Sequence, residues 1–139
     1  MKIVDATGLK LGRLASKVAK EALGGEQISV VNAEKAVITG RKKDIFSTYR
    51  EKRDVGSRYK GPFFPRVPHL IVRRTIRGML PYKKEQGEKA FKRVRVYIGV
   101  PKEFQGQSLS TYDDAKLGIT ERRSYMTIEE IAKDLGWKE

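Results

Sequence analysis

Apolar residues in the first part of the chain follow two different spacings, which predict strands and a helix in turn. Residues 2–5 and residues 28–31 are short apolar runs typical of strands, and the second is rich in β-branched side chains. Between them, residues 12–23 carry an apolar position every three or four residues, which predicts a helix ended by the glycines at 24–25. Residues 36–38 predict a third, weaker strand.

The middle of the chain predicts two helices separated by a loop. The first runs from about residue 41 to 51, with Thr39 as its N-cap. Residues 53–68 have no periodicity and are rich in glycine and proline, which indicates an extended loop. The second helix begins near Pro68 and ends before Pro81, because proline disfavours a helical conformation in the preceding residue. Its apolar face is expected to consist of Val72, Ile76, Met79 and Leu80.

The last third predicts two more helices and one strand. Residues 83–92 form a helix candidate, residues 94–98 alternate like a strand with one polar face, and residues 101–125 are irregular and polar. Thr127 and Glu130 have the spacing of a capping box at the start of the final helix. Gly136 ends that helix, and Trp137 is expected to fold back onto its last turn.

This order of elements predicts an α/β fold in a single domain spanning residues 1–139. We expect three layers, with a small, mostly parallel, four-stranded sheet flanked by helices, and a basic extended loop at residues 53–68.

The charge of the chain lies almost entirely in its middle. The 139 residues include 30 lysines and arginines and 17 acidic residues, a net charge of +13. Residues 41–95 hold 18 basic and 5 acidic residues, whereas the flanks hold 12 of each. Nucleic acid, an anionic membrane or an acidic protein could neutralise this segment. We favour nucleic acid, because the basic helices need their apolar faces for the core and have none left for a membrane.

The basic residues with the clearest direction lie in the helix that begins near Pro68. Arg73, Arg74 and Arg77 fall within an arc of about 100° on a helical wheel. No acidic residue lies between Lys60 and Lys84, so a merely solvated basic face is the less favoured explanation. Arg13, Lys17 and Lys20 form a similar arc on the first helix, where ordinary surface is at least as good an explanation.

Two further basic segments have features of an RNA contact. Arg41, Lys42 and Lys43 stand at a helix start, where cations oppose the helix dipole but free backbone N–H groups favour a phosphate. The 53–68 loop interleaves basic and aromatic side chains, which reach phosphates and stack on unpaired bases, although one of Phe63 and Phe64 is expected in the core. The complete set of expected RNA-binding residues is Arg13, Lys17, Arg41, Lys42, Lys43, Arg58, Lys60, Arg66, Arg73, Arg74, Arg77, Lys83 and Lys84.

Signals for catalysis are weak. The Gly8–Gly12 segment follows a strand and opens a helix, but it matches neither of the glycine-rich nucleotide-binding patterns. His69 is the only histidine, no cysteine is present, and the carboxylate pairs at 113–114 and 129–130 have no metal-ligand spacing. We therefore expect no enzyme, no cofactor and no metal. Without a signal peptide or a long apolar run, we expect a soluble, cytoplasmic protein.

Three groups of motifs resemble a known family. They are Asp5-Ala6 with Leu11–Ser16, Val31–Lys35 with Thr39–Lys42, and Arg74–Pro81 with Gly99–Pro101. In this order and spacing they are similar to the large-subunit ribosomal protein family L-thirteen, in its archaeal and eukaryotic form. The resemblance implies an α/β fold, binding to large-subunit ribosomal RNA, a role in subunit assembly and neighbouring large-subunit ribosomal proteins as partners, without a membrane or a small-molecule substrate. By motif position it implies RNA contact for Arg13, Arg41, Lys42, Arg74 and Arg77.

Three functions remain open at this point. A ribosomal structural protein, in cytoplasmic ribosomes, is the first expectation. A free-standing RNA-binding regulator of translation would share the same basic surface. A nucleotide-dependent enzyme would require the Gly8–Gly12 segment to hold phosphate.

Overall fold

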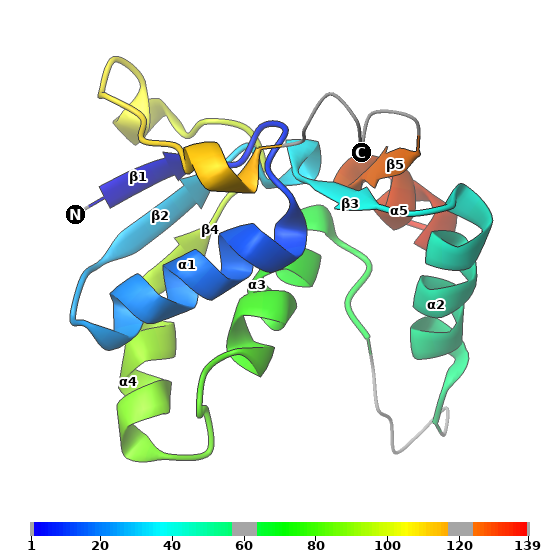
Figure 1. The fold of residues 1–139 in the computed structure, drawn as a ribbon, viewed down its shortest axis with the longest axis horizontal. Coiled ribbons are helices and arrows are strands. Elements are labelled where there is room, and N and C mark those ends of the chain that lie inside the picture. The colour runs from blue at the N-terminus through cyan, green and yellow to red at the C-terminus, as the bar shows by residue number, and fades with distance from the viewer. Residues whose placement is uncertain (1, 57–63, 117–123, 139) are drawn as a thin grey trace.

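The structure is a computed structural model that describes residues 2–56, 64–116 and 124–138 (Figure 1). Its strands are β1 (Lys2–Asp5), β2 (Ile28–Val31), β3 (Val37–Thr39), β4 (Val94–Val96) and β5 (Tyr125–Thr127). Its α-helices are α1 (Leu11–Leu23), α2 (Lys42–Asp54), α3 (Pro68–Gly78), α4 (Glu85–Lys92) and α5 (Ile128–Leu135). Short 3₁₀ turns η1 (Ala33–Lys35), η2 (Lys102–Phe104) and η3 (Asp113–Ala115) lie between them.

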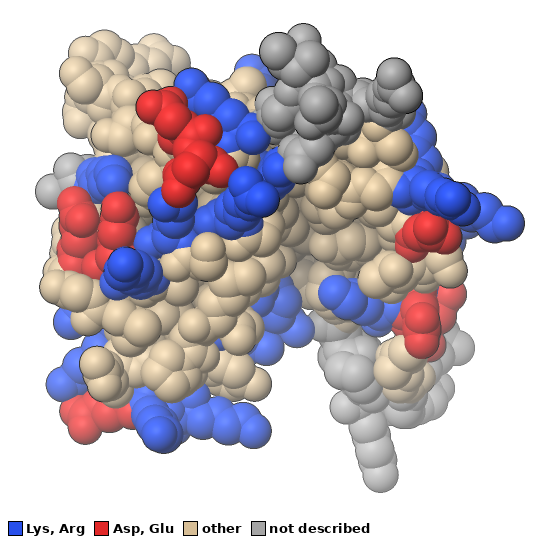
Figure 2. All heavy atoms as spheres, in the orientation of Figure 1, with Lys and Arg blue, Asp and Glu red and all other residues tan. Residues whose placement is uncertain are grey.

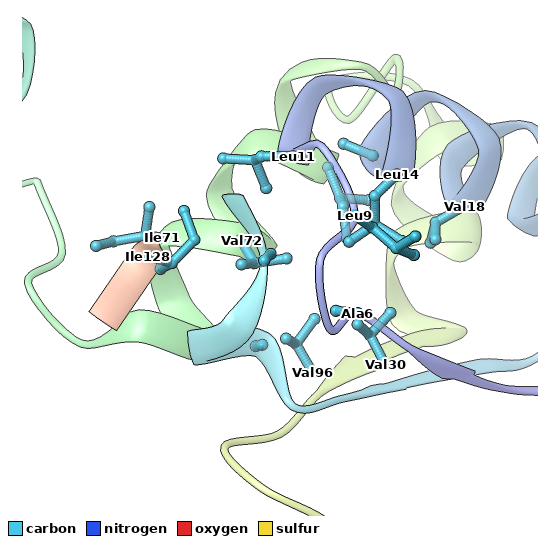
Figure 3. Packing of buried hydrophobic residues seen from close by; sticks show 14 of the residues in the cluster. Ala6, Leu9, Leu11, Leu14, Val18, Val30, Ile71, Val72, Val96 and Ile128 are labelled. Atoms are coloured by element: carbon cyan, nitrogen blue, oxygen red, sulfur yellow. The ribbon is translucent and has the colours of Figure 1, made fainter. Parts of the chain in front are cut away.

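A parallel sheet in the order β1-β2-β4 forms the centre of the fold. Val4 lies opposite Val30, and Val30 lies opposite Val96, so the three valines share one face of the sheet. These valines belong to the main hydrophobic cluster together with Leu14 and Val18 of α1 (Figure 3). The α/β class and the parallel pairing expected from the sequence are confirmed.

The opposite face of this sheet has a different cover. Ile3 and Val31 point to that face and form a small cluster with Phe104 of η2. The helices α1, α3 and α4 lie on the valine side, as Figure 1 shows. Among the described residues, the second face is therefore covered by a connecting segment with one 3₁₀ turn, where we expected a third layer of helix.

The expected four-stranded sheet is also wrong. The strand expected at residues 36–38 does form, as β3, but it pairs antiparallel with β5 in a separate two-stranded sheet. The expected strand at residues 94–98 ends at Val96. β5 was not predicted: it begins at Tyr125, the last residue of the segment expected to be irregular, and its three residues are too few to show a period of two.

The helix α2 is held against α5 at the side of the molecule. The Arg50 guanidinium donates to both carboxylate oxygens of Asp134, from Nε at 2.8 Å and from Nη2 at 2.6 Å. Tyr49 packs against Phe64 with ring centroids 5.8 Å apart. Phe64 thus takes the core position expected for one of the two adjacent phenylalanines, while Phe63 lies outside the described residues.

The end signals of the last helix are confirmed. The Thr127 hydroxyl accepts a hydrogen bond from the Glu130 backbone N–H at 3.3 Å. Gly136 ends α5 with a φ of 110°, a conformation that glycine adopts without strain. The Trp137 backbone N–H then donates to the Ala132 carbonyl at 2.9 Å, and its side chain packs against the core.

Two local expectations are wrong. Thr39 lies within β3, and Arg41 takes the N-cap position of α2 without a capping side-chain hydrogen bond. Met79 was expected in the core, but it follows the last residue of α3 and is 43% exposed. Ile71, the residue before Val72 in α3, is fully buried, although the sequence analysis did not include it in the apolar face.

Candidate RNA-binding surface

The arginines of α3 surround a hollow at the surface. The α3 hollow measures about 170 Å³ and is lined by Pro65, Leu70, Arg73, Arg74, Arg77 and Phe91. All three arginines are partly buried, because α3 packs its other face, with Ile71, Val72 and Ile76, into the core. The three arginines that the helical wheel put in one arc therefore do lie together in the structure.

Two of these guanidinium groups lie over aromatic rings. Arg73 stands 4.3 Å from the ring centroid of Phe91 in α4, and Arg77 stands 4.7 Å from that of Tyr82 in the turn before α4. Such cation–π contacts hold the arginine side chains in place without neutralising their charge. Sequence analysis missed both rings, because their positions relative to α3 depend on the turn that joins α3 to α4.

The charge of the α3 arginines has no counter-charge among the described residues. None of the three forms an ion pair there, and the Arg77 Nε is buried without a hydrogen-bond partner. Burial lowers the pKa of Arg74, and the positive charge of Arg77 lowers it further. An anion bound at this place would compensate the lost hydration of Arg74 and offset its repulsion by Arg77.

A second basic site stands at the start of α2. Arg41, Lys42 and Lys43 are exposed, and none has an ion-pair partner among the described residues. The first backbone N–H groups of a helix have no acceptor within the helix, and the positive end of the helix dipole adds to their attraction for an anion. The arrangement suits a phosphate group, as the sequence predicted.

The short strand β3 connects this site to the start of α1. A hollow of about 300 Å³ lies there, and Lys10, Gly12, Arg13 and Thr39 contribute to its lining. Two of the motifs that are distant in the sequence, Leu11–Ser16 and Thr39–Lys42, are therefore neighbours in space.

The basic face of α1 is partly occupied by an acidic segment. The Arg13 Nη1 donates to the Asp114 carbonyl oxygen at 3.1 Å, and the Lys17 Nζ lies 2.5 Å from the Asp114 carboxylate. Tyr112 anchors this segment, because its buried hydroxyl donates to the Glu21 carboxylate at 2.6 Å. Arg13 and Lys17 are thus less available for RNA than the sequence alone suggested.

The remaining expected residues differ in their surroundings. Lys83 and Lys84 are exposed between α3 and α4, without an ion-pair partner among the residues that the structure describes. Arg66 is exposed, and its charge contributes to lowering the pKa of Asp54, an effect led by the Arg53 guanidinium. Arg58 and Lys60 lie outside the described residues.

The basic residues do not form one continuous patch in the view of Figure 2. A notch separates the part of the molecule that carries α1 from the part that carries α2, and lysine and arginine atoms are visible within it (Figure 2). On the α1 side, basic and acidic groups alternate. This face thus offers separate cationic sites, an arrangement that suits a folded polyanion with phosphates in several directions.

Three backbone donors of the segment before α1 are used within the chain itself. The backbone N–H of Gly8 donates to Lys35, that of Leu9 to Ala6 and that of Lys10 to Ala115, at 2.8 to 3.1 Å. The segment therefore lacks the run of free donors that a glycine-rich nucleotide-binding loop provides, which argues against the nucleotide-dependent enzyme.

In the described part of the chain, no three histidine, cysteine or acidic residues lie close enough together to hold a metal ion. No helix in it has both the length and the apolar character required to cross a membrane.

Comparison with known proteins gives a consistent result. The sequence model of the family described as "Ribosomal protein L13" matches residues 1–103. A protein of Archaeoglobus fulgidus named "Large ribosomal subunit protein uL13" is 50% identical over 137 residues, covering 98% of this chain and 88% of the relative. Proteins with the same name from Methanocaldococcus jannaschii and Methanococcoides burtonii are 50% and 46% identical, each over 99% of both chains.

Proposed function

The chain belongs to the ribosomal protein L13 family, and from this premise we propose that it is a structural constituent of the large ribosomal subunit. In this role it binds ribosomal RNA through its basic surface, helps the subunit assemble in the cytoplasm and performs no catalysis. Residues 1–139 act as one RNA-binding domain, with ribosomal RNA and neighbouring large-subunit proteins as partners.

The observation that carries this proposal is the separation of charge along the chain and across the surface. The whole net charge of +13 belongs to residues 41–95. Within that segment, the arginines of α3 and the cations at the start of α2 have no ion-pair partner among the described residues. Cations left unpaired in the free protein gain their counter-charges from RNA phosphates, with release of bound counterions.

The RNA-binding residues that we propose are those expected from the sequence. Arg41, Lys42 and Lys43 hold a phosphate at the start of α2, and Arg73, Arg74 and Arg77 contact RNA at the α3 hollow. Arg13 and Lys17 contribute once a phosphate has replaced Asp114 as their partner. The other contributors are Arg58, Lys60, Arg66, Lys83 and Lys84.

Sedimentation tests the ribosomal role. Lysate is fractionated on a sucrose gradient, and the particles are then washed with increasing salt. We expect the chain to sediment with the large subunit and to resist moderate salt, because many phosphate contacts must break together. Recovery only in the light fractions would reject this role and leave a free-standing RNA-binding regulator of translation as the better explanation.

The α2 site has its own test. Replacing Arg41, Lys42 and Lys43 by alanine should weaken binding to large-subunit ribosomal RNA and reduce the salt dependence, by a slope of roughly 0.9 for each phosphate of a double-stranded region that the variant no longer neutralises. The replacement of Lys89, Lys92 and Lys133 by alanine is the matched control, since these lysines pair with acidic residues on their own helices. Equal effects of the two replacements would remove the α2 start from the proposed interface.

A further inference from the structure

The α3 hollow combines an apolar wall with a cationic one. Pro65, Leu70 and Phe91 supply carbon surface, and the three arginines supply charged N–H donors. A phosphate alone would leave the apolar wall unused. Its volume of about 170 Å³ has room for a single ring system and is too small for a base pair to enter. The ligand that fits such a lining is flat, of single-base size and attached to a negative charge.

The guanidinium groups beside the hollow are held against aromatic rings. Arg73 rests on the Phe91 ring and Arg77 on the Tyr82 ring, at 4.3 and 4.7 Å from the centroids. A planar group held against a ring loses little further freedom when its N–H edge meets a ligand, so it is prepared for recognition by two parallel hydrogen bonds.

Among the described residues, the polar side chains that line the hollow are hydrogen-bond donors only. No acidic side chain lines it, and the Arg77 Nε is a buried donor that lacks an acceptor among the described residues. Guanine presents two adjacent acceptors, O6 and N7, which match an arginine fork, whereas adenine presents a donor beside its N7 acceptor. A donor-only lining therefore favours guanine.

From these features we propose that the α3 hollow receives the base of a single unpaired guanosine that has left the base stack of an RNA helix. Arg77 or Arg73 binds the O6 and N7 edge, the apolar wall packs against the ring, and Arg74 neutralises the adjoining phosphate. Unpaired bases are the usual source of sequence-specific contacts in RNA, because a paired base is hidden within the helix. This inference rests on the proposed RNA-binding function and adds a specific ligand to it.

The test uses the full chain and RNA hairpins of equal length. One hairpin has a continuous stem, and the others carry a single bulged guanosine or a single bulged adenosine. Fluorescence anisotropy at fixed salt gives the affinities. We expect the guanosine bulge to be bound at least about tenfold more tightly than the other two, the range expected of one bidentate contact.

Two variants locate the contact. Arg77→Lys and Arg73→Lys keep the charge but remove the planar fork. At least one of them should reduce the preference for the guanosine bulge, taken as the ratio of the affinities that the same variant has for the bulged and continuous hairpins, to about twofold or less. The control Arg95→Lys makes the same chemical change at an exposed arginine outside the hollow and should preserve the preference. Thermal unfolding verifies that each variant is folded.

The outcomes separate this inference from the function on which it rests. Tight binding to all three hairpins without a guanosine preference would overturn the inference and leave the RNA-binding function standing. A preference that persists in both lysine variants would also overturn it. Failure to bind any of the hairpins or large-subunit ribosomal RNA would count against the proposed function itself.

Discussion

His69 is the only histidine of the chain, and its position near the start of α3 makes it sensitive to pH. Its Nδ1 is buried without a hydrogen-bond partner among the described residues. Burial lowers the pKa of His69 below its usual 6.5, and the charge of Arg73 lowers it further. His69 is therefore neutral in the folded protein at pH 7 and adds no cation to the RNA-binding surface.

This lowered pKa predicts how stability depends on pH. Below pH 6.5 the histidine of the unfolded chain gains a proton that the folded chain resists, so the free energy of unfolding falls as pH drops below 6.5. The stability is fully present above pH 6.5. Thermal unfolding at a series of pH values from 7.5 to 5 should reveal this loss, and His69→Gln should reduce it.

The acidic groups provide the internal control for this experiment. Partial burial raises the pKa values of Asp5 and Glu21, but hydrogen bonds and nearby lysine charges together outweigh it and lower them below 3.8 and 4.5. The hydrogen bonds come from Thr7 and Asn32 to Asp5, and from Lys2 and Tyr112 to Glu21, so both groups titrate below this range. An unchanged pH dependence in His69→Gln would show that another group causes the loss.

The structural position of a single residue could be predicted where one local interaction determines it. Thr127 and Gly136 satisfy backbone groups at the two ends of α5, a requirement that the sequence states directly. The expectation that Met79 lies in the core was wrong, because the helical wheel was extended beyond the point where α3 ends. The chain turns after Gly78 to reach Leu80 and α4, which directs Met79 outward and leaves Ile71 to fill the core.

At the scale of elements, Gly87 fixes how closely α4 approaches the turn after α3. A Cβ atom at Gly87 would lie 2.0 Å from the Pro81 carbonyl oxygen, a backbone atom that cannot rotate away. We expect Gly87→Ala to lower the free energy of unfolding by about 1–3 kcal/mol, the usual cost of overpacking. Denaturant unfolding measures this change.

The matched control for Gly87 is a helical glycine with open space around it. A Cβ at Gly12 in α1 would meet no atom within 4 Å. Gly12→Ala should therefore be neutral or stabilise the protein by about 0.5–1 kcal/mol, because alanine restricts the unfolded chain more than glycine does. Equal stability changes in the two variants would contradict a close contact between α4 and the turn.

The segment around η3 competes with RNA for the basic face of α1. Asp114 pairs with Lys17 across the chain, and hydrogen bonding with Lys17 lowers the pKa of this carboxyl group. Asp114→Asn frees Lys17 for a phosphate, so we expect several-fold tighter binding to ribosomal RNA and a salt-dependence slope larger by up to about 1. Filter binding over a range of salt concentrations measures both quantities.

Asp113 provides the comparison for this effect. Asp113→Asn changes the net charge by the same amount, but among the described residues Asp113 pairs with Lys116 of its own segment, at 3.0 Å, and not with α1. It should increase the affinity less than Asp114→Asn does. Identical gains from both variants would indicate a general effect of net charge and remove the competition at α1.

The elements themselves were predictable to different degrees. Each of the five helices has a recognisable apolar repeat or end signal, and all were expected near their observed positions. β3 and β5 contain three residues each, and their pairing joins segments about ninety positions apart, from Val37 with Thr127 to Thr39 with Tyr125. No local pattern records such a partner, so β3 was assigned to the wrong sheet.

For the whole molecule, composition predicted the class of partner and left the geometry of contact open. The charge between residues 41 and 95 indicated a polyanion. The α3 hollow depends on Pro65 before α3 and Phe91 in α4, which come together only after the chain has folded. The occupation of Arg13 and Lys17 by Asp114 likewise depends on a contact across about a hundred residues.

The final prediction concerns the balance between stability and RNA binding in the free protein. Arg74 and Arg50 are both arginines on helices, but their surroundings have opposite effects. Burial and the charge of Arg77 lower the pKa of Arg74, so the fold disfavours its positive charge. Hydrogen bonds to Asp134 raise the pKa of Arg50, so the fold favours that charge.

Replacing each arginine by glutamine should therefore have effects of opposite sign. We expect Arg74→Gln to raise the melting temperature by roughly 1–3 °C at low salt, an amount typical of a few tenths of a kcal/mol in a domain of this size. Arg50→Gln should lower the melting temperature. In 0.5 M salt, where the Debye length is only about 4 Å, screening weakens the Arg50–Asp134 pair and the repulsion of Arg74 by Arg77, but the cost of burying Arg74 remains.

RNA binding should change in the reverse direction for Arg74. In the free protein the charge of Arg74 lowers stability, and in the complex it binds a phosphate. Arg74→Gln should therefore be more stable and bind ribosomal RNA less tightly. Anisotropy and thermal unfolding on the same samples test both halves together. A lower melting temperature in Arg74→Gln, matching that of Arg50→Gln, would show that the fold itself requires Arg74 and would contradict a charge held ready for RNA.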